Sequence, residues 1–228
     1  MKSLWGMFVL GSLTCAPAFA SIVYVTSPAA LAEDDTASWS QLGATQTSIP
    51  SSFSATSVGG LAITGTIASG TGTVLAIPTD WPAGPNFSSG DSVIWTSNGS
   101  TDNGPLTLAF SALFGAGAYV QADGTGAFTG SIQAFGSGGS LGTFTASSSN
   151  GDPIFLGVLD TLQEVTSIKL SLTVAPANFT VFDFAVDTLY LNAPVSATPE
   201  PGSLVLVGGA LAGLGWKLRR RTRTTGRL

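Results

Sequence analysis

Two late segments, 168–174 and 180–191, alternate apolar and polar side chains with a period of two. The apolar positions are Ile168, Leu170, Leu172 and Val174 in the first segment, and Phe182, Phe184, Val186 and Tyr190 in the second. Successive side chains of a β-strand point to opposite faces, so this period predicts antiparallel strands with one face on a core and the other polar.

Most of the remaining chain divides into short apolar runs that end at Gly, Asn, Asp or Ser, as strands do. These runs are 22–26, 61–64, 73–77, 92–96, 106–114, 118–122, 130–135, 141–146 and 154–159. We expect turns at 48–52 and 78–82, and a short helical stretch is possible around 29–39. About ten short strands at regular spacing predict an all-β fold, an antiparallel β-sandwich of jelly-roll type.

Charge in this 228-residue chain is sparse and unevenly placed. Between Ser21 and Thr198 there are twelve acidic side chains and a single basic one, Lys169, which gives a net charge of −11. Such an acidic body repels phosphate backbones, so nucleic acid is excluded as a partner.

The sequence contains no histidine, and its single cysteine, Cys15, lies in the N-terminal apolar segment. The most frequent general base, metal ligand and thiolate nucleophile are therefore absent from the body of the chain. Zinc bound by His or Cys and Ser-His-Asp catalysis are both excluded. We expect no catalytic residues, no metal site and no cofactor, and hence a protein that is not an enzyme.

Carboxylates remain as possible functional groups. Asp183 and Asp187 are four residues apart on one expected strand, which places them roughly 13 Å apart. This exceeds the ~5–9.5 Å of glycosidase pairs, so a solvated face is the favoured interpretation and a glycoside hydrolase the weakest alternative. Asp123 and Asp152 fall in expected turns. Oxygen-rich loops can bind Ca²⁺, but no loop has the dense spacing of a strong site, so Ca²⁺ is a minor possibility.

Tryptophan side chains could stack on sugar rings. Trp81 is the best candidate for a sugar contact because it lies in a loop flanked by Pro78 and Pro82. Trp95 falls inside an apolar run, where a core position is the favoured interpretation.

The N-terminus has the three parts of a secretory signal peptide: Lys2, an apolar stretch 4–13 and the small-x-small site Ala18-Phe19-Ala20 before Ser21. We expect cleavage after Ala20, with the Sec translocon and signal peptidase as partners.

The C-terminus combines Pro199-Glu200-Pro201, an uncharged apolar run 203–216, and a basic cluster. The cluster consists of Lys217, Arg219, Arg220, Arg221 and Arg223. A run of this length is short of the ~20 residues of a full span, although flanking residues could extend it into a transmembrane helix over about 203–218. The positive-inside rule keeps the basic cluster in the cytoplasm and the preceding domain outside the inner membrane.

This order of features resembles the PEP-CTERM sorting signal of exported proteins from Gram-negative bacteria that produce exopolysaccharide. The resemblance implies processing by exosortase, a membrane-embedded enzyme. Segments 117–123, 151–158 and 183–189 also resemble the lectin-like sandwich domains that this family often carries, which supports the fold more than a function.

We therefore expect a signal peptide at 1–20, a β-sandwich ectodomain at 21–195 and a sorting tail at 196–228. The expected function is that of an exported, non-catalytic protein, held briefly in the inner membrane by its tail, cut by exosortase and delivered to the cell surface or extracellular matrix. Two alternatives are a carbohydrate-binding module for exopolysaccharide and a permanently anchored single-pass surface protein.

Overall fold

The computed structural model describes residues 22–82, 84–97, 104–177 and 182–194. The expected signal peptide, sorting motif, transmembrane helix and basic cluster lie outside these residues, as does Ser21 of the expected cleavage site. Among the residues that are described, no helix has the length and apolar character needed to cross a membrane.

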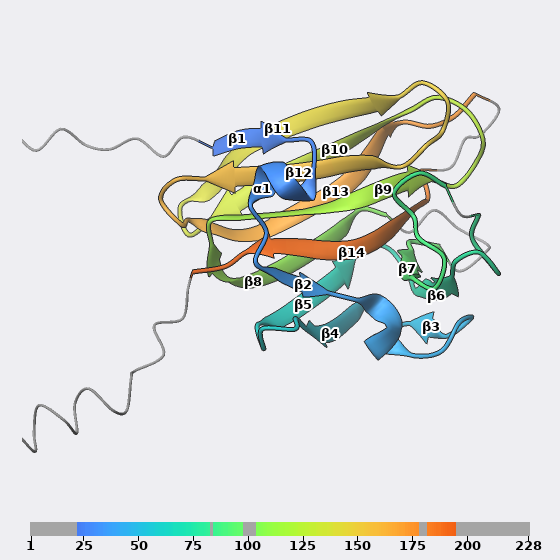
Figure 1. Cartoon of the computed structure of the whole chain (residues 1–228), viewed down its shortest axis with the longest axis horizontal. Helices are drawn as coiled ribbons and strands as arrows, with labels where there is room; N and C mark the ends of the chain where they lie inside the picture. The colour runs from blue at the N-terminus through green and yellow to red at the C-terminus, as the bar shows by residue number, and fades with distance from the viewer. Residues whose placement is uncertain (1–21, 83, 98–103, 178–181, 195–228) are drawn as a thin grey trace, which may run out of the picture. The chain divides into compact units, whose positions relative to one another are not determined.

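Strands dominate the described body and form two antiparallel sheets (Figure 1). The larger sheet contains β1 (Ile22–Val25), β2 (Asp35–Ala37), β3 (Ser48–Ile49), β6 (Gly72–Ala76), β7 (Ser92–Trp95), β9 (Gly115–Ala122), β12 (Ile154–Asp160) and β14 (Phe184–Asn192). The smaller sheet contains β4 (Ser52–Thr56), β5 (Ala62–Ile67), β8 (Leu106–Leu113), β10 (Phe128–Gly136), β11 (Gly139–Ser148) and β13 (Val165–Val174). Two short helices, α1 (Pro28–Leu31) and the 3₁₀ turn η1 (Trp39–Leu42), complete the described elements.

The strand order confirms the expected jelly roll. The larger sheet includes the run β7-β14-β9-β12, and the smaller sheet includes β8-β13-β10-β11. Consecutive strands from β7 to β10 therefore alternate between the sheets, and β11 to β14 return beside them. This is the eight-strand, double Greek-key arrangement of a jelly roll. The remaining strands extend the two sheets beyond this unit.

The core lies between the sheets and is built from the alternating apolar positions of both. Leu108, Ile132 and Leu170 of the smaller sheet are fully buried against Val120 and Val186 of the larger one. Burying a side chain of this size contributes about 1.5–3 kcal/mol, so a domain without disulfides can be stable on packing alone.

Most expected strands are confirmed, but the first third of the chain differs from the prediction. The short strands β2, β3 and β4 were not expected, and β3 occupies part of the predicted turn at 48–52. The possible helix at 29–39 is reduced to α1 and η1, with β2 between them. Tertiary pairing decides these segments, because β2 is held by β14 and β3 by β6 rather than by local propensity.

A β-bulge in β14 changes which side chains of this strand face the core, compared with the prediction. Val186 pairs with Val120 of β9, whereas Leu189 pairs with Ala118, so three residue steps on β14 oppose two on β9. The extra residue reverses the alternation. Phe184, Val186, Leu189 and Leu191 therefore line the core, and Tyr190 lies on the other face. At the end of β13, the expected core residue Val174 is 53% exposed.

Two satellite clusters cover parts of the outer face of the larger sheet. Near one end, Leu31 of α1 packs on Phe155 and Val25. Elsewhere on this face, the connection between β6 and β7 folds back and packs Ile77, Trp81 and Phe87 on strand residues such as Val93. The two ends of this connection are joined by a hydrogen bond, in which the Ile77 amide donates to the Asp91 carbonyl at 3.0 Å. This connection provides one wall of the pocket described below.

Glycines at the centre of the outer face give room to aromatic rings. Gly117 of β9 pairs with Gly157 of β12, and the ring of Phe155 lies above both. A Cβ on Gly117 would come within 2.7 Å of the Phe155 ring and 2.7 Å of the Gly157 Cα. Phe155 in turn makes edge contacts with Tyr119 and Tyr190.

We expect Gly117→Ala to destabilise the domain by about 1–3 kcal/mol, because the added methyl group overpacks a contact that includes backbone atoms. Urea unfolding of the variant and the parent protein measures this difference. Gly138→Ala is the matched control, since a Cβ at Gly138 meets nothing within 4 Å. Equal losses at both positions would contradict this account of the glycine pair.

Candidate functional site

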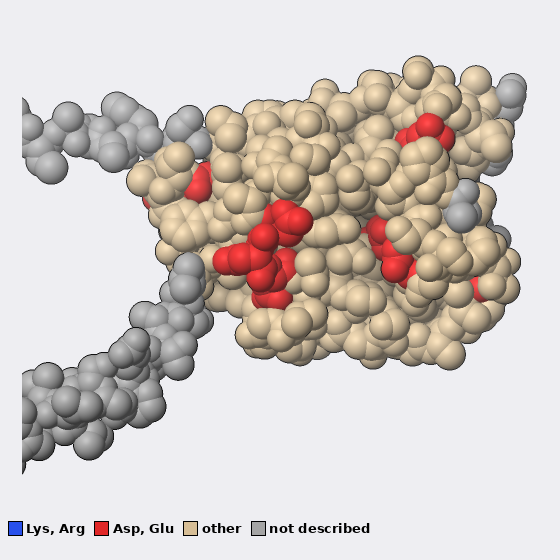
Figure 2. Space-filling model, viewed as in Figure 1, with Lys and Arg blue, Asp and Glu red and all other residues tan. Residues whose placement is uncertain are grey.

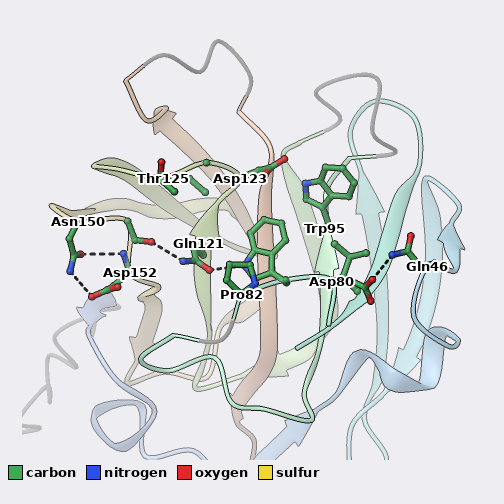
Figure 3. A pocket seen from close by; sticks show the side chains of 14 residues that line it. Gln46, Asp80, Pro82, Trp95, Gln121, Asp123, Thr125, Asn150 and Asp152 are labelled. Atoms are coloured by element: carbon green, nitrogen blue, oxygen red, sulfur yellow. Dashed lines mark hydrogen bonds between the residues drawn. The ribbon is translucent and has the colours of Figure 1, made fainter. Parts of the chain in front are cut away.

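A pocket of about 600 Å³ opens beside the connection between β6 and β7 (Figure 3). Its walls come from this connection, from β7, from the end of β9 with the turn that follows, and from the turn before β12. The lining residues are Gln46, Leu75, Asp80, Trp81, Pro82, Trp95, Gln121, Ala122, Asp123, Gly124, Thr125, Asn150, Gly151 and Asp152. A volume of this size suits a small organic ligand.

Trp81 lies in the pocket wall, but most of its ring is packed rather than displayed. Its side chain is 6% exposed and belongs to the apolar cluster under the β6–β7 connection. The indole N–H donates to Gln121 Oε1 at 2.6 Å, and Gln121 Nε2 donates to the Gly151 carbonyl at 2.9 Å. This chain of hydrogen bonds ties three walls together, so Trp81 fixes the shape of the pocket. Trp81 lies in a loop, as predicted, and a sugar contact by this side chain stays a prediction.

Trp95 offers the more accessible aromatic surface. It is half-buried at the end of β7, where the predicted core position is only partly correct. Its indole N–H is buried, and no acceptor within the described part of the protein meets the distance and angle of a hydrogen bond. The group lies close enough to the Asp123 carboxyl to oppose the effect of burial, which raises the pKa of that carboxyl. A donor and an acceptor therefore meet at the mouth of the pocket beside an aromatic ring (Figure 3).

The turn before β12 holds a third group of polar atoms. Asn150 Nδ2 donates to the Asp152 carboxylate at 2.6 Å, and the Asp152 amide donates to Asn150 Oδ1 at 3.2 Å. Ser148 and Gly151 support the turn, since the Gly151 amide donates to Ser148 Oγ at 3.1 Å. Gly151 has a φ of +91°, which favours glycine. The Asp152 carboxylate is thus oriented before any ligand arrives.

Asp80 closes the opposite side of the pocket. Its carboxylate accepts hydrogen bonds from the Thr45 hydroxyl and from Gln46 Nε2, the latter at 2.6 Å. These two bonds lower the pKa of Asp80, so the group is ionised at neutral pH.

The electrostatics of the pocket are negative. Three carboxyl groups line it, and no lining residue is basic. Figure 2 shows acidic side chains gathered over one face of the molecule and no Lys or Arg among the described residues on that face. Lys169, the single basic residue between Ser21 and Thr198, lies on β13 of the other sheet. The described residues contain no group of three or more His, Cys, Asp or Glu side chains that could hold a metal ion.

Asp183 and Asp187 do not form the solvated face that was expected. They are buried instead, with exposed fractions of 5% and 2%, respectively. Burial raises the pKa of Asp187 from 3.8 to about 6, and the nearby Asp91 carboxylate adds to this rise. Burial and, to a smaller extent, the Asp187 carboxyl raise the pKa of Tyr190 to about 12. Tyr119 and Glu33 belong to the same electrostatic neighbourhood.

We expect Asp187→Asn to stabilise the domain at pH 7 by on the order of 2 kcal/mol. The folded state binds the Asp187 proton more tightly than the unfolded state does. The stability that Asp187 contributes is therefore fully present below about pH 4. It is lost as the pH rises through the folded-state pKa of about 6. Asn keeps an oxygen that can accept from the Thr188 hydroxyl, as Asp187 does at 3.4 Å.

Chemical unfolding at several pH values between 4 and 8 measures this effect. The Asn variant should have a flatter pH profile, whereas Glu164→Gln, at an exposed position, should leave the profile of the parent unchanged. A variant that keeps the parent slope would show that Asp187 is not the group responsible.

The structure thus brings together four residues that were considered separately in the sequence, namely Trp81, Trp95, Asp123 and Asp152. Sequence reasoning missed Gln121, Asn150 and Asp80 as pocket residues. An Asn-Gly-Asp turn and an Asp beside prolines signal turns, but nothing local indicates that the two turns lie against one strand end.

Comparison with known proteins bears on the tail rather than on the pocket. Residues 197–221 match the PEP-CTERM protein-sorting motif, which confirms the family resemblance seen in the sequence. A search of curated proteins found no match. The motif spans the Pro-Glu-Pro element and most of the basic cluster, and it marks the chain as an exported protein that exosortase sorts to the surface or outside of the cell.

Proposed function

We propose that this protein is a non-catalytic surface or matrix protein, which its tail holds briefly in the inner membrane before exosortase cuts it near Pro199-Glu200-Pro201. The sorting motif at 197–221 supports this proposal most directly. Two prolines keep the backbone extended and remove hydrogen-bond donors, which suits a segment that must enter a protease cleft. The basic cluster that follows supplies the charge that retains the end of the chain in the cytoplasm.

Intact-mass measurement of the protein from its native producer tests the processing step. We expect a mature form that begins at Ser21 and ends before the basic cluster. Replacing Pro199, Glu200 and Pro201 with alanine should leave the chain uncut and in the membrane fraction. A wild-type form that still ends at Leu228 would contradict processing and would instead support a permanent single-pass anchor.

We further propose that the sandwich binds carbohydrate, with exopolysaccharide of the producer as the ligand. The observation that carries this proposal is the pocket, where the Trp95 ring lies beside the Asp123 carboxyl and the amide groups of Gln121 and Asn150 belong to the same lining. Sugar recognition needs this combination, since an aromatic face covers the C–H groups of the ring and paired acceptors and donors bind its hydroxyls. Catalysis would require an acid or base placed against a reacting bond. The pocket carboxyls have structural partners instead, which favours binding.

We expect Trp95→Ala to weaken binding of the producer's polysaccharide by about tenfold or more, since a lost stacking contact of this type costs about 1–2 kcal/mol. Titration of the purified polysaccharide into the protein, followed by tryptophan fluorescence or calorimetry, measures the change. Leu162→Ala, a truncation at a 40% exposed position outside the pocket, serves as the control, and thermal unfolding verifies that both variants are folded. Flat binding curves with the parent protein would dispose of the carbohydrate proposal.

A further inference from the structure

The charge of the pocket restricts which sugar it can accept. Its lining contains Asp80, Asp123 and Asp152 and no basic residue. Carboxylate, phosphate or sulfate groups on a ligand would face like charges with no counter-charge in the wall. Acidic sugars are therefore disfavoured in this pocket.

We propose that the pocket selects a hexosamine whose amino group is not acylated and therefore carries a positive charge. The inference rests on the carbohydrate binding proposed above and names the class of sugar. Ammonium groups of such a ligand would contact the Asp123 and Asp152 carboxyls, which belong to separate turns, and one of its sugar rings would lie against Trp95.

Two features favour an organic ammonium group over a metal ion. No cluster of three or more metal-ligating side chains occurs in the described ranges, so the pocket carboxyls do not converge on one point. An extended ligand, in contrast, can contact carboxyls that belong to separate turns. The Trp95 ring adds a surface that attracts an organic cation and does not ligate a metal.

The hydrogen-bonding groups of the pocket match those of this ligand. An ammonium group has three donors and no acceptor, so it matches carboxylates that accept only. The neighbouring hydroxyls of the sugar can both donate and accept. The Trp95 indole N–H lies close to the Asp123 carboxyl, and the remaining acceptor sites of this carboxyl would bind the ligand. The Gln121 amide is fixed by Trp81 and Gly151, and it holds the floor of the pocket in place.

The Asp123 environment adds a second, independent indication. Burial raises the pKa of this carboxyl, and the Trp95 N–H is the one side-chain group in the described structure that acts to lower it. A cation placed beside Asp123 would stabilise the ionised carboxylate. A positively charged ligand would thus lower the free-energy cost of keeping Asp123 ionised at a half-buried position.

Calorimetric titration of the full chain in mild detergent with three tetrasaccharides tests the proposal. The probes are β-1,4-linked glucosamine, its fully N-acetylated counterpart and a tetramer of galacturonate. We expect the glucosamine tetramer to bind, the N-acetylated tetramer to bind at least about tenfold more weakly, and the galacturonate tetramer to give no signal. Raising the salt concentration should weaken glucosamine binding, because the contact is ionic.

Two pocket variants and one control make the site assignment specific. Asp123→Asn and Asp152→Asn should each reduce glucosamine affinity by about tenfold and leave the weak binding of the N-acetylated tetramer unchanged. Glu33→Gln removes the same charge at an exposed position outside the pocket lining and should change neither affinity. The Asp152→Asn variant retains a side-chain oxygen that can accept from Asn150 Nδ2, so it keeps the test valid if Asp123→Asn disturbs folding.

The outcomes separate this inference from the function on which it rests. Equal affinity for the acylated and unacylated tetramers, or preference for galacturonate, overturns the charge selectivity and leaves carbohydrate binding intact. If the producer's polysaccharide binds but all three tetrasaccharides give flat curves, the proposed selectivity for an unacylated hexosamine is overturned. Flat curves with the polysaccharide as well overturn the proposed carbohydrate binding itself.

Discussion

The architecture depends on the central strand β14, which hydrogen-bonds with β9 on one side and with β7 and β2 on the other. Its bulge between Val186 and Leu189 keeps apolar side chains on the core at both ends of the strand and places Tyr190 on the opposite face. The Trp39 indole donates to the Asp187 carbonyl at 2.8 Å, so η1 is fixed at the same point. Removing this strand would separate both halves of the larger sheet.

The pocket is a consequence of how connections cross the outer face of that sheet. A strand alone presents every second side chain in a row, and it cannot surround a ligand. The connection between β6 and β7 supplies the missing wall because its own apolar residues pack on the sheet, with Trp81 as the link to Gln121. Stability and site geometry are therefore coupled through one buried ring. The negative charge of the pocket is tolerated because each carboxyl lies at a turn, within reach of donors or solvent.

Much of the fold could be read from the sequence, and less of the site. The alternating segment at 168–174 predicted β13 with its core face correct except at Val174, and strand-length runs predicted most of the other strands. Strands β2 and β3 could not be predicted, because a segment of two or three residues becomes a strand only when a partner pairs with it. Asp187 illustrates the same limit, since its burial depends on tertiary packing and the bulge beside it on the pairing with β9.

The sequence by itself determined where this protein goes and which side-chain chemistry it lacks. The sorting motif is a local sequence signal, and the absence of histidine needs no structure to interpret. Only the tertiary structure decided that Trp81 is a buried support, that Trp95 faces the pocket, and that Asp123 and Asp152 belong to one site. These residues are distant in the chain, and the jelly-roll strand order β12-β9-β14-β7 brings them together.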